Sequence, residues 1–539
     1  MKFTTAAASL ALLAASADAF KPGPVVQPRS RDRKGPAIQV LPRQFPAEPE
    51  GVQTIISPSG ANITYKEPGK EGICETTPGV NSYAGFINLG QDVHSFFWFF
   101  ESRRDPANDP LTLWLNGGPG SDSLIGLFQE LGPCNVTEDL VTALNPYAWN
   151  EVSNMLFLSQ PIGVGFSYGG KAEASKGIFG EFIPADEAEP DGRYPTFDPS
   201  AIDTTDLAAI AAWEVVQGFY SALPQLDSNV SSTTFNLATE SYGGHYGPAF
   251  FKYFYDQNEL IKNGTIQGQE LEFSSLTLIN AIIDEAIQAP YYPEFANYNT
   301  YGIKALNDTM YNYASWAVVM PNGCLDQLTY CNVANQSTAV GQAVCAEAAL
   351  MCRDNTQAAL GVDTNYTSFS NNDIYYAFQQ TGDFVYPNFK EDLEAILNAS
   401  VRVSMIYGDA DYICNWFGGE AVSKGVQYTN TEEFNAAGYT PMVVDGVQYG
   451  ETREYGNFSF TRIYEAGHEV PYYQPIAALQ LFNRTIFGFD TATGTKKVTE
   501  DLSTSGNANT THTASAPPLA SETGGAVLGD GKKAIWWRS

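Results

Sequence analysis

The sequence has few basic side chains and almost no histidine. Its 539 residues include 60 acidic, 29 basic and four histidine side chains, which gives a formal net charge of −31 at pH 7. A nucleic-acid binder needs a basic surface that displaces counterions from phosphates. We therefore expect no nucleic-acid partner. Any reaction that requires a histidine has four candidates, which are His94, His245, His468 and His512.

Beyond the N-terminus, the sequence lacks an apolar run of about 18 residues, so no transmembrane helix is expected. The N-terminus begins with Lys2, continues with an Ala/Leu-rich run and reaches small residues at positions 17–19. This pattern is typical of a secretory signal peptide. We predict a signal peptide over residues 1–19, a Pro/basic linker or pro-segment over 20–48, and a secreted protein. A cell-wall or vacuolar location is the alternative.

Eleven N-x-S/T sequons agree with export, because such sites are glycosylated in secreted proteins. The predicted glycosylation sites are Asn62, Asn135, Asn229, Asn263, Asn307, Asn335, Asn365, Asn398, Asn457, Asn483 and Asn509.

The sequence has only seven cysteines, and in an oxidising compartment they can form three disulfides with one cysteine left over. Cys324 and Cys331 lie seven residues apart, as do Cys345 and Cys352, and this spacing places each pair on one face of a helix. The simplest closure is nested, with Cys324–Cys352 outside Cys331–Cys345. Cys74–Cys134 is then the third pair, and Cys414 is left free.

The hydrophobic fraction of 44% excludes general disorder, and short apolar runs bounded by turn residues indicate an α/β protein. Such runs suit strands that helices bury on both faces. A helix is expected from residue 203 to 223. The expected strands cover residues 96–100, 111–115, 155–158, 235–238, 276–279, 401–407 and 462–464.

The interval 285–400 has four cysteines and no strong strand run, so it reads as an inserted, disulfide-stapled lid or cap. We predict an α/β-hydrolase core in two parts, 49–284 and 401–500, and a disordered Ser/Thr/Gly-rich tail over 501–539.

The segment from Thr234 to His245 has the layout of a nucleophile elbow. A β-prone run leads to Ser241 between Tyr242 and Glu240, and a helix-like stretch follows. A sharp strand-to-helix turn exposes the serine hydroxyl over the sheet. Thr239 replaces the first glycine of G-x-S-x-G, which leaves an ordinary strand–turn–helix serine as the alternative.

A serine nucleophile needs a base, and in this fold the acid and the histidine follow the serine along the chain. His94 precedes Ser241, His245 is only four residues beyond it, and His512 lies in the predicted tail. His468 therefore remains as the base. The strand predicted over 401–407 leads to two candidate acids, Asp409 and Asp411, between which position alone does not choose. The sequence has no H-E-x-x-H motif and no Cys/His ligand set, so neither a metal nor another cofactor is expected.

With these residues in place, the sequence resembles the serine carboxypeptidases, the group that includes carboxypeptidase Y, and especially the secreted fungal members. Four blocks carry the resemblance: 113–120 (LWLNGGPG), 240–242 (ESY), 408–415 (GDADYICN) and 467–471 (GHEVP). They follow the family order and, with supporting stretches, span about residues 74 to 485.

The resemblance assigns roles to single positions. It implies Asp411 as the acid of the triad, backbone N–H groups of Gly118 and Tyr242 as the oxyanion hole, and Cys414 as a free cysteine of the specificity pocket. The residues that it implies for binding the terminal carboxylate of the substrate are Asn116, Gly117, Glu130 and Glu240.

Two glutamates bind an anion only if they share protons, because close carboxyls raise one another's pKa and a protonated carboxyl donates a hydrogen bond. This leads to the hypothesis that peptide hydrolysis is favoured at acidic pH.

Two departures from the family pattern matter. Ser121-Asp122-Ser123 stands where the family commonly has Cys-Ser-Ser, and Glu469 stands where a Met commonly follows the catalytic histidine. A carboxylate at position 469 favours a basic departing residue. A solvated surface glutamate is the alternative.

The sequence therefore predicts a serine-type carboxypeptidase that acts on peptide and protein C-termini through an acyl-enzyme, as a monomer or homodimer. An acyltransferase or esterase on the same scaffold is the first alternative, and an inert binding glycoprotein is the second.

Overall fold

The structure is a computed structural model that describes residues 49–90, 93–137, 139–177, 182–354 and 371–515. The predicted signal peptide 1–19, the linker 20–48, the sequon at Asn365 and the tail beyond residue 515 lie outside these ranges. No helix of the described ranges is both long enough and apolar enough to span a bilayer.

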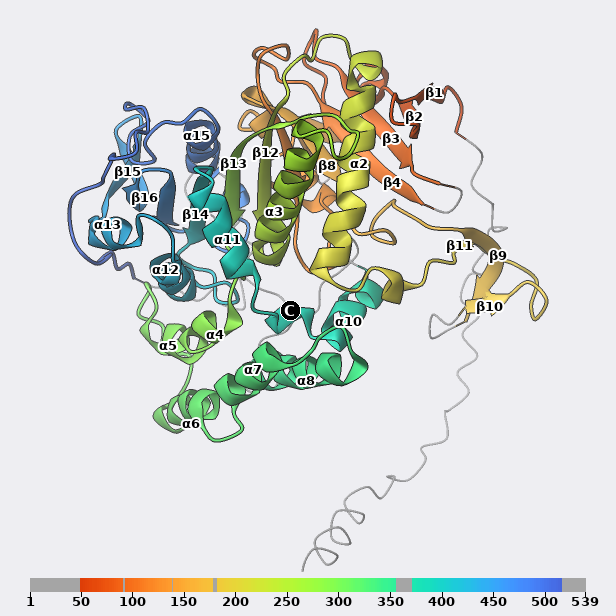
Figure 1. Ribbon diagram of the computed structural model, residues 1–539. Helices are drawn as coiled ribbons and strands as arrows, with labels where there is room; N and C mark the ends of the chain where they lie inside the picture. The colour runs from red at the N-terminus through yellow and green to blue at the C-terminus, as the bar shows by residue number, and fades with distance from the viewer. Residues whose placement is uncertain (1–48, 91–92, 138, 178–181, 355–370, 516–539) are drawn as a thin grey trace, which may run out of the picture. The chain divides into compact units, whose positions relative to one another are not determined.

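A twelve-stranded mixed sheet forms the centre of the fold (Figure 1), in the order β1-β2-β3-β4-β8-β5-β12-β13-β14-β17-β16-β15. The six strands from β8 to β17 run parallel to one another, and all other pairs in this sheet are antiparallel. The strands are β1 (Gln53–Ile56), β2 (Asn62–Lys66), β3 (Ser82–Asn88), β4 (His94–Phe100), β5 (Leu111–Leu115), β8 (Asn154–Leu158), β12 (Thr234–Glu240), β13 (Glu272–Ile279), β14 (Arg402–Gly408), β15 (Thr440–Val444), β16 (Val447–Tyr455) and β17 (Phe458–Ile463).

Each strand expected from an apolar run overlaps one of these strands. The expected strands 111–115 and 96–100 fall on β5 and β4, while 462–464 meets only the end of β17. Two small sheets lie outside the main one. They consist of β6 (Cys134–Val136) with β7 (Thr142–Leu144), and of β10 (Phe182–Pro184), β9 (Lys171–Lys176) and β11 (Gly192–Pro195).

Helices cover both faces of the sheet, because alternate side chains of each central strand enter separate apolar clusters. Leu113 and Leu237 pack with residues of α2 (Thr205–Leu226) and α3 (Gly243–Lys262), which both lie on the near side of the sheet in Figure 1. Trp114 and Ala238 point the other way and join residues of α15 (Pro475–Ile486). This two-sided burial explains the continuous apolar runs of the central strands.

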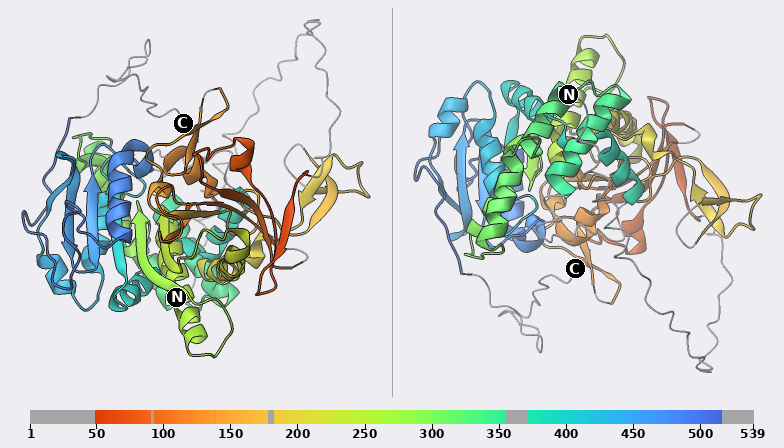
Figure 2. Two further views of the ribbon diagram at one scale, coloured as in Figure 1. Left: turned by 90° about the horizontal axis from the view of Figure 1, so that it is seen from above. Right: turned by 90° about the horizontal axis from the view of Figure 1, so that it is seen from below.

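A helical segment lies between β13 and β14 in the sequence, where an insertion is expected. Most of its helices lie below the sheet in Figure 1 and stand in front of it in the right-hand view of Figure 2, which is seen from below. Its elements are α4 (Glu285–Gln288), α5 (Tyr291–Tyr298), α6 (Asp308–Val319), α7 (Cys324–Val333), α8 (Ala339–Ala349), η5 (Leu350–Asp354), α10 (Asn372–Thr381), η6 (Asp383–Val385) and α11 (Phe389–Asn398). The remaining elements are η1 (Pro68–Glu71), η2 (Gly126–Glu130), η3 (Trp149–Glu151), η4 (Pro199–Ala201), α12 (Trp416–Gly425), α13 (Thr431–Ala436) and α14 (Val470–Tyr473).

Three disulfides join the same pairs that the sequence leads us to expect. Cys324–Cys352 and Cys331–Cys345 are nested and connect α7 with α8 and η5. Cys74–Cys134 links the loop before β3 to β6. Cys414 is free and buried.

The prediction of a disordered tail from residue 501 is wrong for residues 501–515. Asn507 and Ser503 form isolated bridges with Tyr439 and Tyr455, at the far edge of the sheet. Two buried arginines also hold the segment, because Arg453 donates to the Ala508 carbonyl (2.6 Å) and Arg462 to the His512 carbonyl (2.9 Å). Its polar composition hides this order, since backbone atoms make most of the contacts.

The described sequons differ in exposure. Asn457 and Asn483 are half-buried, and the Asn457 side-chain amide donates to the carbonyls of Leu397 (3.2 Å) and Val401 (2.7 Å). The other described sequon asparagines are exposed: Asn62, Asn135, Asn229, Asn263, Asn307, Asn335, Asn398 and Asn509.

Candidate active site

Ser241 occupies the sharp turn between β12 and α3. Its φ is +65°, a left-handed conformation that is unusual for a residue other than glycine and costs free energy. Gly243 and Gly244 allow the tight turn, because a Cβ atom on Gly244 would stand 2.1 Å from the Ile282 carbonyl oxygen. The elbow expected from the sequence is therefore present.

Thr239, which replaces the usual first glycine, has a local function in this turn. Its hydroxyl donates to the Gly243 carbonyl at 2.7 Å and so bridges the end of β12 and the start of α3. A Cβ atom on Gly243 would lie 2.6 Å from the Thr239 Cβ, so a side chain at position 243 would collide with this bridge.

Asp411 and His468 come together above the ends of β14 and β17. His468 Nδ1 lies 2.8 Å from Asp411 Oδ2, and the same oxygen accepts from Asn280 Nδ2 at 2.6 Å. The other oxygen accepts the Ile413 N–H at 3.0 Å. These bonds hold the carboxylate in place, and its bond to Nδ1 orients the imidazole ring, as expected of the acid in a catalytic triad.

The environment of His468 favours a charged ring. Burial alone would lower the pKa of the ring, but the adjacent Asp411 carboxylate and Cys414 raise it well above its usual value. A carboxylate that stabilises the imidazolium supports proton transfer from a nucleophile to this ring.

The carboxylate of Asp409, the other candidate acid, is occupied by other partners. Its Oδ1 accepts the Tyr301 hydroxyl (2.7 Å) and the Glu465 N–H (2.9 Å), and its Oδ2 lies 3.4 Å from Arg462 Nη2. The side chain is completely buried. Asp409 therefore anchors the loop that carries His468 and does not reach the imidazole.

The other histidines have structural contacts. His245 is buried, stacks on Tyr242 with ring centroids 4.3 Å apart, and has Nδ1 2.8 Å from the Ile282 carbonyl. Burial lowers the pKa of His245 to about 3, so the ring is neutral. His94 begins β4, and His512 stacks on Tyr464.

The loop after β5 lies directly against the elbow. A Cβ atom on Gly117 would stand 2.4 Å from the Tyr242 backbone nitrogen, so only glycine allows this approach. Gly118 adopts φ +106°, which also favours glycine. The geometry brings Gly117, Gly118 and the Tyr242 N–H to one place, next to Ser241.

Asn116, Glu130 and Glu240 form a buried hydrogen-bonded group. Asn116 Oδ1 accepts from Trp114 Nε1 (2.8 Å) and from the Gly126 N–H (2.9 Å). The amide group must therefore turn its Nδ2 toward the glutamates, where it donates to Oε1 of each at 3.2 Å. The Oε2 atoms of Glu130 and Glu240 are buried and have no hydrogen-bond partner.

Glu469 joins this group, and we call Glu130, Glu240 and Glu469 the carboxyl cluster. Burial and the charges of Glu240 and Glu469 raise the pKa of Glu130 well above its usual value. Burial also raises the pKa of Glu240, to about 7, and that of the half-buried Glu469. Carboxyls that lie close together without a cation to neutralise them hold protons that isolated glutamates would lose.

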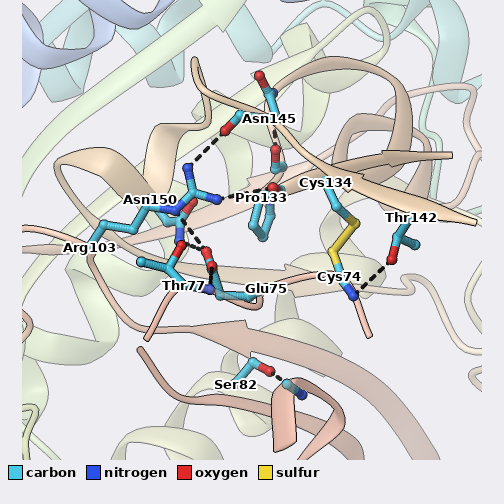
Figure 3. Close-up of a disulfide and its surroundings, with 12 residues drawn as sticks. Cys74, Glu75, Thr77, Ser82, Arg103, Pro133, Cys134, Thr142, Asn145 and Asn150 are labelled. Carbon is cyan, nitrogen blue, oxygen red and sulfur yellow. Dashed lines mark hydrogen bonds and ion pairs between the residues drawn. A yellow bond between two sulfur atoms is a disulfide. The ribbon is translucent and has the colours of Figure 1, made fainter. Parts of the chain in front are cut away.

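The segment that carries Glu130 is firmly anchored, as Figure 3 shows. The Cys74–Cys134 disulfide closes next to the nearly buried guanidinium of Arg103, which donates to Glu75 (2.9 Å) and to the Pro133 and Asn145 carbonyls. The rigid end of η2 keeps Glu130 in the interior despite its desolvation.

Cys414 lies beside the acid and the base. One ligand atom from each of Asp411, Cys414 and His468 lies within 4.8 Å of the others, and among the described residues this is the group whose geometry could hold a metal ion. Asp411 and His468 already share a hydrogen bond, so an ion bound by these side chains would compete with that bond.

Asp122, which stands where the family commonly has a serine, is buried and points to Ser159. Its Oδ1 accepts the Ser159 hydroxyl at 2.8 Å and the Leu124 N–H at 3.2 Å. Burial raises its pKa to about 6. These bonds tie the loop after β5 to the loop after β8.

Comparison with known proteins gives this site its family. Residues 68–346 and 310–488 match the family model described as serine carboxypeptidase. The chain belongs to the serine carboxypeptidase family. It is a serine-type carboxypeptidase, and its fold is that of the α/β-hydrolases.

Several fungal serine carboxypeptidases are similar over most of the chain. Carboxypeptidase S1 homolog B of Arthroderma otae is 40% identical over 84% of this chain and 80% of its own. Carboxypeptidase S1 of Penicillium janthinellum is 35% identical over 77% of this chain and 97% of its own. Kex1, a prohormone-processing carboxypeptidase from Saccharomyces cerevisiae, shares the fold, with a TM-score of 0.57, 19% identity, and coverage of 77% of this chain and 92% of that structure.

Sequence reasoning did not find two residues that hold the site together. Asn280 donates a hydrogen bond to Asp411, and Asp383 accepts one from the hydroxyl of Tyr242. The position of Asn280 directly after β13 is a signal, because side chains at the carboxyl ends of parallel strands meet at one sheet edge. Asp383 has no comparable signal.

Proposed function

We propose that this serine carboxypeptidase is secreted, releases C-terminal residues through an acyl-enzyme, works best at acidic pH and prefers a basic departing residue. The observation that carries the proposal is the buried carboxyl cluster, whose Glu130 and Glu240 each have one oxygen without a partner beside the nucleophile elbow.

In the proposed reaction, Ser241 Oγ attacks the carbonyl carbon of the last peptide bond while its proton passes to His468 Nε2. Asp411 holds the Nδ1–H and stabilises the imidazolium. The backbone N–H groups of Gly118 and Tyr242 stabilise the tetrahedral oxygen, because fixed donors in a buried site need no reorganisation.

The tetrahedral intermediate then collapses and the C–N bond breaks. His468 gives its proton to the departing amine, and an ester joins the shortened peptide to Ser241. Water attacks this ester with His468 again as base, and the serine is regenerated.

The terminal carboxylate of the substrate is proposed to bind Asn116, Gly117, Glu130 and Glu240. Because Asn116 Nδ2 donates to Oε1 of both glutamates, their acidic protons belong on Oε2, the atoms without partners. A protonated Oε2 donates to the substrate anion, whereas an ionised one repels it. A pKa of about 7 for Glu240 supports loss of peptide binding as the pH rises through that value.

Two titrations therefore oppose each other. His468 must be neutral to accept a proton, and its raised pKa reduces the neutral fraction in acid. Glu240 must be protonated to receive the substrate, and this condition moves the optimum of peptide hydrolysis to lower pH than that of a substrate without a free carboxylate. An ester substrate without a free carboxylate needs only the first condition.

Glu469 supports the preference for a basic departing residue. It belongs to the carboxyl cluster and begins the turn into α14, where its carbonyl accepts the N–H groups of Tyr472 and Tyr473. A lysine or arginine side chain that reached Glu469 would neutralise a half-buried carboxyl.

Mass spectrometry of a peptide ladder tests the proposal, with Ser241→Ala as the matched control. We expect stepwise loss of C-terminal residues, faster from peptides that end in Arg than from those that end in Leu. Loss from a peptide amide, which lacks the terminal carboxylate, should be slower. Ladder formation by Ser241→Ala would contradict the assigned nucleophile. Equal pH profiles for peptide and ester would contradict the role of the carboxyl cluster.

Export and assembly have their own tests. Mass analysis of the material from the culture medium is expected to give a chain that starts near Phe20 and carries N-linked glycans. Retention of residues 1–19 would contradict a signal peptide. The proposed state in solution is a monomer or homodimer.

A further inference from the structure

Asp383 lies in η6 of the inserted segment, yet its carboxyl reaches the residue that follows the nucleophile. Its Oδ2 accepts the hydroxyl of Tyr242 and also the Thr205 hydroxyl (2.6 Å) and N–H (3.1 Å). All three side chains are buried. One carboxyl oxygen therefore joins the inserted segment, the first turn of α2 and the nucleophile elbow.

Aromatic side chains pack around the ring of Tyr242. His245 stacks on it, Phe384 packs edge-on with ring centroids 5.0 Å apart, and Phe378 does the same at 6.1 Å. The backbone nitrogen at the other end of the residue lies against Gly117. Because the ring and the backbone move together, the hydroxyl contact with Asp383 limits where the Tyr242 N–H can point.

We propose that Asp383 is a positioning residue, which holds the Tyr242 N–H in the oxyanion hole through the phenol. The inserted segment would then contribute to transition-state stabilisation although it supplies neither of the proposed donors. This inference rests on the proposed roles of Ser241 and Tyr242.

A second link ties the same turn to α2 without touching the elbow. The Thr381 hydroxyl donates to the Asp203 carbonyl at 2.9 Å. Thr381→Val therefore removes an attachment of the inserted segment and leaves the Tyr242 hydroxyl its partner, which makes it a matched control.

The carboxyl of Asp383 acts as an acceptor, and an amide can replace it in that function. Burial raises the pKa of Asp383 to about 7, so the group is largely neutral in acid, where an asparagine has similar charge and shape. Asp383→Asn should therefore restore what Asp383→Ala loses.

The test compares kcat and KM of full-length Asp383→Ala, Asp383→Asn, Tyr242→Phe and Thr381→Val on one peptide in acid. Active enzyme is counted by titration with a fluorophosphonate that labels the nucleophilic serine. We expect Asp383→Ala and Tyr242→Phe to lose about tenfold in kcat with KM changed less than about twofold, because small displacements of an oxyanion donor slow the chemical step. Asp383→Asn and Thr381→Val should stay near the parent value.

Full kcat per titrated site in Tyr242→Phe would overturn the inference, as would an equal loss in Thr381→Val or no recovery in Asp383→Asn. Tyr242→Phe removes a single hydroxyl, so the inference stays testable if Asp383→Ala fails to fold. If the parent enzyme leaves the peptide intact, or if Ser241→Ala hydrolyses it, the proposed function fails instead.

Discussion

Buried carboxyls near this site differ in whether their charge is neutralised by neighbouring groups. Asp409 has Arg462 at 3.4 Å and two further donors, so its charge is compensated on both oxygens. Glu130 and Glu240 share one neutral amide and keep one bare oxygen each.

The difference separates an anchoring carboxyl from one that is ready for a ligand. A buried ion pair whose remaining atoms are hydrogen-bonded holds its segment in place, and loss of one partner is costly. A buried carboxyl without a cation holds a proton instead, and its unused oxygen is available to a substrate. Asp411 lies between the two extremes, since its donors are Asn280 and His468.

The largest expected effect separates Asp411 from Asp409. Asp411→Asn should lower kcat by about 10⁴-fold, because an amide at this position favours the wrong tautomer of His468. Steady-state kinetics of peptide hydrolysis, with thermal unfolding as the check on the fold, measures it. Asp409→Asn is the control, and its kcat per active site should fall far less. A loss for Asp409→Asn as large as that for Asp411→Asn would erase the distinction.

The second expected effect concerns stability. Asp409→Asn leaves the buried guanidinium of Arg462 without its closest carboxylate and should lower the free energy of unfolding by about 3 kcal/mol. Glu130→Gln removes no ion pair and should leave the stability unchanged or higher at pH 7. Urea unfolding monitored by tryptophan fluorescence compares them. The comparison fails if Glu130→Gln is the more damaging change.

The third expected effect is on the pH profile. The pKa of Glu240 is raised to about 7, so the proton is present below that pH and is lost above it. Glu240→Gln donates a hydrogen bond at every pH, and its peptide kcat/KM should therefore fall less steeply above pH 7 than that of the parent enzyme. An ester substrate should give the same profile with both proteins. A peptide profile that stays unchanged in Glu240→Gln would rule out Glu240 as the titrating donor.

Much of the fold and the triad could be predicted because their signals are local or follow chain order. Buried parallel strands such as β5 and β8 have nearly continuous apolar runs, and the order Ser241, Asp411, His468 follows from the fold class. The family resemblance, and not position, selected Asp411 over Asp409.

What remained hidden depends on partners that are distant in sequence. Asn280 meets Asp411 across 131 positions, and Tyr242 meets Asp383 across 141. The outer strand β16 has buried Arg453 and Glu454, so it lacks an apolar run. Arg453 is bound by the ordered residues of the tail, which composition alone predicts to be disordered.

The smallest expected effect tests whether Glu469 belongs functionally to the carboxyl cluster. Glu469→Met should lower the ratio of kcat/KM for peptides ending in Arg to those ending in Leu by about tenfold, or about 1.4 kcal/mol. The expectation follows from the half-buried position of Glu469, where a basic side chain would pair with it under less solvent screening than at the surface. Competition between the two peptides in one mixture measures the ratio directly. Glu465→Met is the control, because Glu465 is exposed in the same loop, and it should leave the ratio unchanged. If Glu469→Met leaves the ratio unchanged too, Glu469 is a solvated surface side chain and only Glu130 and Glu240 contrast with Asp409.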